Sequence, residues 1–194
     1  MSIDQARTNR ERTEATRSAL LDAARALFMD RGYADTSTPD ICAAAGITRG
    51  ALYHHFADKR DLFRHVLERD AAAVAAEIAY ATPPAMAPRE ALAAGSHAYL
   101  RAMAAPGRTR LLLIDGPAVL GLSELLAIDR AHAAQSLREG LAAAMGRSPE
   151  DVDVLARLLS AAFDRAALEI DAGTDTYAVT AAMLALLDRV IGHA

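Results

Sequence analysis

Gly46 and its surroundings constrain the fold of this 194-residue chain more than any other feature of the sequence. The stretches on either side, 39–45 and 49–55, each combine apolar residues at helical spacing with a start signal. Pro39 is tolerated in a first helical turn because its missing N–H has no helical partner there. A glycine is favoured in the tight turn between two helices that cross steeply. The sequence therefore predicts a helix-turn-helix within residues 37–56.

Composition favours helices along the rest of the chain. Alanine and leucine dominate, while aromatic residues make up only 5% of the sequence, and this mixture favours helix over sheet. Hydrophobic residues make up 53%, enough to bury a core. The predicted fold class is all-α. Apolar spacing and breaks predict about nine helices and no strand, over residues 11–30, 39–45, 49–55, 58–80, 88–104, 108–114, 122–145, 149–170 and 175–191.

A proline-rich stretch at residues 82–88 marks the expected domain boundary. We predict a disordered polar tail at residues 1–10. Residues 11–81 are expected to form a three-helix domain that includes the helix-turn-helix and a connecting helix. Residues 82–194 are expected to form a second, all-helical domain.

Charge and cysteine content bear on partners and compartment. The first 70 residues hold 11 basic and 11 acidic side chains, so the net charge of −4 arises in the remainder. The single cysteine, Cys42, excludes an internal disulfide and is expected to be a small buried residue. The N-terminus is polar, and no apolar stretch approaches the length of about 20 residues that spans a membrane. We expect a cytoplasmic protein without a signal peptide or membrane segment.

The second short helix is expected to present a polar face to DNA. Inward-pointing apolar residues hold the helix pair together, namely Ile41, Ile47, Leu52 and Phe56. The exposed face then consists of Thr48, Arg49, Gly50, Tyr53 and His54. In a helix-turn-helix this face enters the major groove. Arginine bonds guanine edges or phosphates, and a glycine lets the helix approach the bases closely.

Phosphate contacts are expected beside this face. Lys59, just inside the next helix, offers a positive charge and a helix N-terminus to a phosphate. The turn ahead of the first short helix offers hydroxyls for the same purpose, from Thr36, Ser37 and Thr38.

Residues 14–74 resemble the TetR/AcrR family of regulators. The matching positions, in order and spacing, are Gly32-Tyr33, Thr36-Ser37, Asp40-Ile41, Ala44-Ala45-Gly46-Ile47, Gly50, Leu52-Tyr53, His55-Phe56, Lys59 and Leu62-Phe63. Thr38 departs from the family pattern, where this position is usually apolar, and Pro39 stands where a polar residue is commoner. The resemblance implies a three-helix DNA-binding head, a connecting fourth helix, and a C-terminal ligand-binding and dimerisation domain.

From this resemblance we expect a sequence-specific DNA-binding transcriptional regulator. It is expected to bind a palindromic operator as a homodimer, with two heads about 34–36 Å apart or near a multiple of one DNA turn. A repressor released by a small, apolar effector is favoured over an activator. The effector is expected among the helices of residues 88–170, with the fourth helix as the lever between the domains.

Candidate ligand contacts in the second domain are the polar and large apolar residues within its helices. These are His97, Met103, Asp115, His132 and Phe163. For Asp115, capping a helix is favoured over a ligand contact, and each histidine is equally suited to a structural role.

Apolar stripes on residues 149–170 and 175–191 are expected to serve both the core and a second subunit. The dimer-interface candidates are Leu155, Leu159, Phe163, Met183, Leu187 and Val190.

The sequence contains no Gly-rich phosphate loop, nucleophile elbow or His-Glu-x-x-His motif, so an enzyme is not expected. His54 and His55 are adjacent and lack the i, i+4 spacing of a metal pair, and we expect neither metal nor cofactor. Two alternatives remain: a DNA binder without sequence preference, and an all-helical enzyme or ligand-binding protein with a vestigial head.

Overall fold

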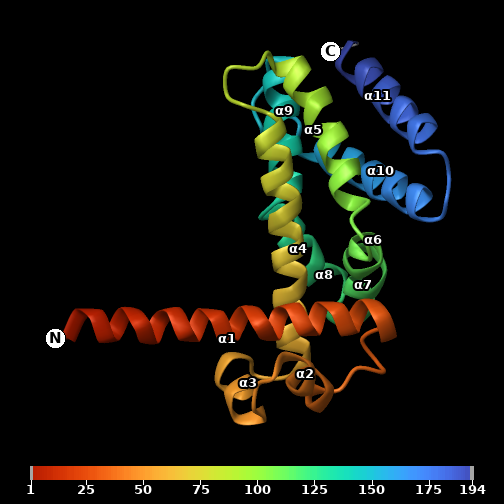
Figure 1. The fold of residues 1–194 in the computed structure, drawn as a ribbon. Coiled ribbons are helices and arrows are strands. Elements are labelled where there is room, and N and C mark those ends of the chain that lie inside the picture. Colours follow the sequence, from red (N-terminus) through yellow and green to blue (C-terminus); the bar gives the residue numbers. More distant parts are fainter. Residues whose placement is uncertain (1, 193–194) are drawn as a thin grey trace. The chain divides into compact units, whose positions relative to one another are not determined.

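The computed structural model describes residues 2–192, with side chains from Arg10 onward, and its regular structure is helical throughout (Figure 1). No strand occurs in that range, so the all-α prediction is confirmed. The chain forms two compact units that divide between Glu68 and Arg69, here called unit 1 and unit 2. Helix α4, Lys59–Ala81, therefore contributes residues to both units. The proline-rich loop that we expected as the boundary follows the end of α4.

Unit 1 consists of the start of α4 and three preceding helices, α1 (Ser2–Arg31), α2 (Thr38–Ala45) and α3 (Arg49–His55). Its core is formed by large side chains that are almost fully buried, namely Leu20, Phe28, Ile41, Leu52, Phe56, Leu62 and Phe63. Helix α1 begins at Ser2 rather than near Glu11. Residues 2–10 contain no glycine or proline to stop a helix, so the stretch expected as a tail continues α1.

Local capping explains where α2 and α3 begin. The hydroxyl of Ser37 accepts a hydrogen bond from the N–H of Asp40 at 3.3 Å, and the N–H of Ser37 donates to the Asp40 carboxylate at 3.1 Å. Thr48 Oγ1 accepts from the N–H of Ala51 at 3.3 Å. Gly46 ends α2 with a φ of 67°, a left-handed conformation that favours glycine. The predicted helix-turn-helix is therefore present, with boundaries within one residue of expectation.

Unit 2 contains the rest of α4 followed by a longer series of helices. These are α5 (Pro88–Met103), α6 (Arg108–Arg110), the π-helical segment η1 (Leu111–Asp115), α7 (Gly116–Leu120), α8 (Leu122–Arg130), α9 (Ala133–Met145), α10 (Asp153–Asp171) and α11 (Thr176–Gly192). A hydrophobic cluster from α5, α9, α10 and α11 forms its core, comprising Leu92, Leu141, Ala142, Val152, Ala156, Leu159, Leu187 and Ile191.

Three helix boundaries in unit 2 differ from the predictions. The single helix expected over 122–145 is two helices, because the backbone leaves the helical conformation at His132 and the carboxylate of Asp129 accepts the N–H of Ala134 at the start of α9. The helix expected to end at residue 114 continues through η1 into α7, whose first turn accommodates Pro117. Helix α10 begins at Asp153 because residues 149–152 form turns.

A buried arginine joins α4 and α6 within unit 2. The guanidinium of Arg108 donates to Glu77 at 3.2 Å and to the carbonyl of Ala102 at 2.5 Å, and lies 3.9 Å from the carboxylate of Asp70. A buried charge is tolerated only when it is paired and hydrogen-bonded in this way. None of the described helices combines the length and apolar character that crossing a bilayer requires.

Candidate functional site

The exposed face of α3 is held in place from behind by two buried side chains. Leu52 and Phe56 are 0% and 1% exposed and pack into the core of unit 1. The opposite face carries the polar side chains that the sequence predicted for the groove, and these residues are all exposed: Thr48, Arg49, Gly50, Tyr53 and His54. A short helix anchored by apolar residues thus presents hydrogen-bonding groups to solvent at a fixed angle.

Tyr53 is oriented by polar contacts although 47% of it is exposed. Its hydroxyl lies 3.4 Å from Thr38 Oγ1, which connects α3 to the first residue of α2. Hydrogen bonds from Thr38 and from Arg49, one turn earlier on α3, lower the pKa of Tyr53. Thr38, at a position that is usually apolar in the family, therefore helps to orient Tyr53.

A Cβ built on Gly50 meets no atom within 4 Å, so packing within the protein does not require a glycine at this position. The space in front of Gly50 is open on the same face as Arg49 and Tyr53. Because Gly50 has no side chain, another molecule can approach the backbone of α3 closely at this position.

Lys59 and Thr36 make internal contacts. The Lys59 ammonium donates to the carbonyls of Tyr33 at 2.9 Å and Thr36 at 3.0 Å, and lies 4.1 Å from the centre of the Tyr33 ring. Thr36 is 1% exposed, and its hydroxyl donates to the carbonyl of Gly32 at 2.8 Å. Both side chains therefore hold the connection between α1 and α2 in place.

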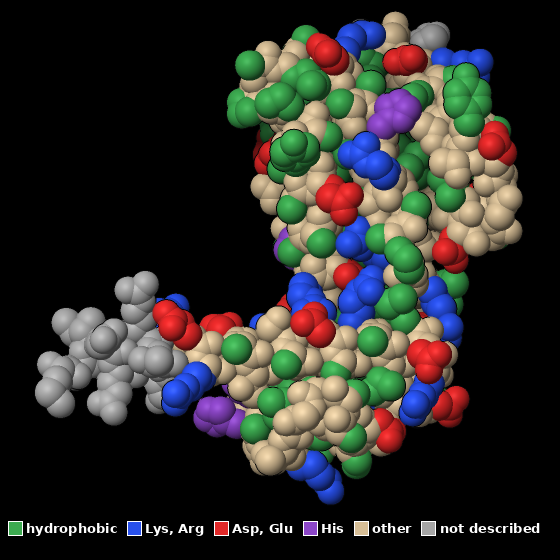
Figure 2. Space-filling view, viewed as in Figure 1, with side chains coloured by type: hydrophobic (Ala, Val, Ile, Leu, Met, Phe, Trp, Pro, Cys, Tyr) green, Lys and Arg blue, Asp and Glu red, His purple; other side chains and the backbone are tan. Residues whose placement is uncertain are grey.

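The remaining polar residues of the head have local roles. The Ser37 hydroxyl donates to the Asp40 carboxylate at 2.5 Å, and these hydrogen bonds lower the pKa of Asp40. Cys42 is 6% exposed, as expected, and burial raises the pKa of its thiol. Partial burial lowers the pKa of His55, whose ring contacts Phe56. Acidic and basic side chains are interspersed on the face of unit 1 that Figure 2 shows.

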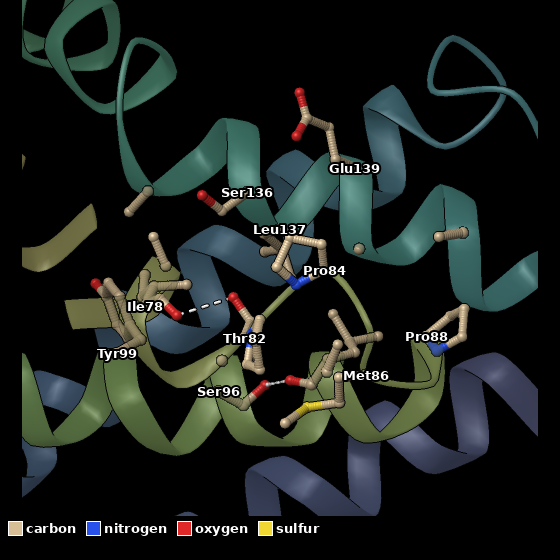
Figure 3. Close-up of a pocket in the computed structure, with 18 of the residues that line it drawn as sticks. Ile78, Thr82, Pro84, Met86, Pro88, Ser96, Tyr99, Ser136, Leu137 and Glu139 are labelled. Atoms are coloured by element: carbon tan, nitrogen blue, oxygen red, sulfur yellow. Dashed lines mark hydrogen bonds between the residues drawn. The ribbon is translucent and has the colours of Figure 1, made fainter. Parts of the chain in front are cut away.

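Unit 2 contains a cavity of about 610 Å³ between α5, α9 and α10, bordered by the end of α4 and the loop after it (Figure 3). Its walls are mostly apolar, with five hydroxyl side chains and one carboxylate. The main lining residues are Ile78, Thr82, Pro84, Met86, Leu92, Ser96, Tyr99, Ser136, Leu137, Glu139, Ser160 and Phe163. A cavity of this size is typical of small-molecule sites.

The candidate ligand contacts are scattered relative to this cavity. Phe163 lines it, whereas His97 is exposed on α5 and Met103 is buried at the end of that helix without lining it. Asp115 forms an ion pair with Arg110 at 3.4 Å. His132 lies in the break between α8 and α9, next to a lining residue but not in the wall itself.

Sequence reasoning missed the polar end of the cavity. The Tyr99 hydroxyl donates to the carboxylate of Asp164 at 2.6 Å, and the Ser160 hydroxyl donates to Asp129 at 3.4 Å. Burial raises the pKa of Asp164 to about 6 and also raises the pKa of Asp129. The only sequence signal was that Asp164 follows Phe163 on an apolar stretch of α10.

The dimer-interface candidates lie mainly inside unit 2. Leu159, Phe163, Met183 and Leu187 are each less than 9% exposed, and Leu155 and Val190 are partly buried against the hydrophobic cluster. Other apolar side chains of α10 and α11 face solvent instead, namely Val154, Leu158, Tyr177 and Leu186.

A helix-turn-helix with an exposed polar second helix, followed by an all-helical unit that contains a cavity, defines the class of DNA-binding transcription regulators. Comparison with known families agrees. Residues 20–66 match the model for bacterial regulatory proteins of the tetR family, and residues 89–193 match the tetracyclin repressor-like C-terminal domain. The chain belongs to the TetR family of transcriptional regulators, which are not enzymes.

Individual relatives support the same assignment. The chain is 46% identical over 63 residues to the HTH-type transcriptional regulator AcrR of Shigella flexneri, a match that covers 32% of this chain and 29% of that protein. It is 44% identical over 63 residues to the repressor BepR of Brucella suis, covering 32% and 30%. The chain thus matches less than a third of the length of these curated relatives.

A solved structure extends the likeness to the whole chain. A TetR-family regulator from Pectobacterium atrosepticum is 33% identical, with a TM-score of 0.69, over 93% of this chain and 94% of that one.

Proposed function

We propose that this protein is a repressor that reads a palindromic operator through α3. The observation that carries the proposal is the exposed row of Arg49, Gly50 and Tyr53 on a helix anchored by Leu52 and Phe56. This face has the donors that recognise base edges and phosphates in a major groove. Because the head is electrically balanced, a few placed groups supply the affinity rather than a broad basic surface.

DNA selection followed by a gel shift tests this reading. Sequences bound from random DNA are expected to converge on one palindromic site. Arg49→Ala is expected to cost about 1–3 kcal/mol and to relax the sequence preference at the position it contacts. With about 6–10 phosphate contacts, affinity is expected to fall about 10³-fold or more between 50 and 200 mM salt. Binding that ignores sequence would favour an architectural DNA-binding protein instead.

The proposed functional unit is a homodimer formed through α10 and α11. Val154 and Leu158 are 61% and 66% exposed and lie one turn apart on α10, and Tyr177 is 81% exposed at the start of α11. An apolar face of this kind is what two copies bury against each other across a two-fold axis. A second head at fixed spacing is also what a palindromic operator requires. Sedimentation analysis is expected to show a dimer.

The proposed regulatory step is release from DNA by a small molecule bound in the cavity of unit 2. The cavity volume of about 610 Å³ and its mostly apolar walls support this role. Helix α4 contributes Ile78 to the cavity and Phe63 to the core of the head, so one continuous helix contains residues of both units. A ligand shifts operator affinity only by its differential affinity for the DNA-bound and released states.

A further inference from the structure

Most hydroxyl groups that line the cavity can act toward a ligand only as hydrogen-bond acceptors. Five hydroxyl side chains line the cavity, and four of them donate their proton within the protein. Thr82 and Ser96 donate to the helix carbonyls of Ile78 and Leu92, at 2.9 Å and 2.7 Å (Figure 3). Each of these oxygens can accept a further hydrogen bond but has no proton left to donate.

The other two donating hydroxyls point at carboxylates just behind the wall. Tyr99 donates to Asp164 at 2.6 Å, and Ser160 donates to Asp129 at 3.4 Å. Neither carboxylate lines the cavity itself, so each acts through the hydroxyl that it polarises. A hydroxyl that donates to a carboxylate becomes a stronger acceptor on its free side. The Tyr99 end of the cavity is therefore electron-rich.

Negative charge at this end is only partly compensated within the described part of the chain. No described lysine, arginine or histidine forms an ion pair with Asp164, and burial together with the negative charge of Asp129 raises its pKa to about 6. Burial also raises the pKa of Asp129, although hydrogen bonds from Ser160 and Ala134 and the charges of His132 and Arg130 oppose this shift. A buried carboxylate without a cationic partner is unfavourable, and a positive charge brought near it is stabilised.

Two aromatic rings stand beside the same oxygens. Tyr99 and Phe163 both line the cavity, with ring centres 5.8 Å apart at an angle of 71°. Ring faces attract cations. No lysine, arginine or histidine is among the residues described as lining the cavity, and its carboxylate, Glu139, points away from the interior in Figure 3. An anionic ligand finds no charged partner here.

We propose that the effector of this cavity is a lipophilic organic cation, an amine whose ammonium group donates to the oxygens of Tyr99 and Ser160 while its hydrocarbon part fills the apolar remainder. The proposal rests on the proposed effector-binding function and adds the chemical class of the ligand. It also excludes fatty acids and other carboxylates as the preferred ligands of this site.

The test uses three probes with the same chain and different head groups: octylammonium, 1-octanol and octanoate. Isothermal titration calorimetry with the 194-residue chain at pH 7.5 measures each affinity. Octylammonium is expected to bind at least tenfold more tightly than octanoate, and more tightly than 1-octanol. Equal or tighter binding of octanoate would overturn the proposal, and so would the absence of binding by all three probes.

Two variants test whether Asp164 causes the preference for octylammonium over 1-octanol. Asp164→Asn keeps the shape and the acceptor for Tyr99 but removes the charge, so the advantage of octylammonium over 1-octanol is expected to fall about tenfold. Asp188→Asn, at an exposed position on α11 outside the cavity lining, is the matched control and is expected to leave that advantage unchanged. If the control removes the preference as well, the preference comes from the overall charge of the protein and the assignment to Tyr99 and Ser160 is wrong.

Folding and DNA binding are measured in parallel, so that separate failures can be distinguished. Circular dichroism melting verifies that each variant is folded, and Tyr99→Phe, which removes the acceptor oxygen, serves as a second variant with the same expected loss. Operator affinity without any probe tests the DNA-reading function alone. A preference for octylammonium without operator binding would support this inference and contradict the repressor proposal. Operator binding without that preference would support the repressor proposal and contradict this inference.

Discussion

Replacing Asp164 by asparagine is expected to stabilise the protein at neutral pH. Burial, with Asp129 nearby, raises the folded-state pKa of Asp164 from 3.8 to about 6. A carboxyl whose pKa is raised by folding costs stability when ionised. The cost is absent below pH 3.8, grows as the pH rises toward 6, and is constant above. At about 1.36 kcal/mol per pH unit, the cost above pH 6 is about 3 kcal/mol.

Urea unfolding of both proteins at equal protein concentration measures this difference. Asp164→Asn is expected to raise the free energy of unfolding by about 2–3 kcal/mol at pH 7.5 and by almost nothing near pH 4. Asp188→Asn, at an exposed position on α11, is the control and is expected to change stability by less than about 0.5 kcal/mol. A neutral or destabilising effect of Asp164→Asn at pH 7.5 would show that this carboxylate is solvated or paired, and the reasoning about the cavity would fail with it.

Three further variants separate folding from function. Gly50→Ala has room for its methyl group and adds helix propensity, so the melting temperature is expected to hold or rise while operator affinity in a gel shift falls. Lys59→Met removes the donor to the carbonyls of Tyr33 and Thr36, and urea unfolding is expected to show a decrease of about 1–3 kcal/mol in the free energy of unfolding. An unchanged free energy of unfolding would instead favour a role for Lys59 in binding phosphate. Leu158→Arg places a charge on the exposed face of α10 and is expected to give a folded monomer by sedimentation, whereas a persistent dimer would place the interface elsewhere.

The head was predictable because its signals are local. Gly46, Thr48 and Pro39 act within one turn of their own position, and the structure places the ends of α2 and α3 within one residue of expectation. Lys59 shows the limit of this reasoning. Its partners, the carbonyls of Tyr33 and Thr36, lie more than twenty residues away, and only the folded chain brings them to the ammonium.

Unit 2 was less predictable because its features depend on tertiary packing. The apolar stripes of α10 and α11 mark a buried face, but they do not distinguish the core of one copy from a surface shared by two. The break at His132 depends on a hydrogen bond from a backbone N–H to Asp129, and the spacing of apolar residues in the sequence does not predict such a bond. Tyr99 and Ser160 donate hydrogen bonds to carboxylates on other helices, so no short sequence motif indicates these pairs.

The central claim is that α3 reads DNA sequence, and selection from random DNA tests it most directly when wild type and Arg49→Ala are run side by side. We expect one palindromic consensus for the wild type and a loss of preference at the same base pair in each half-site for the variant. An unchanged consensus in Arg49→Ala, or no consensus in either protein, would contradict the assignment of α3 as the recognition helix.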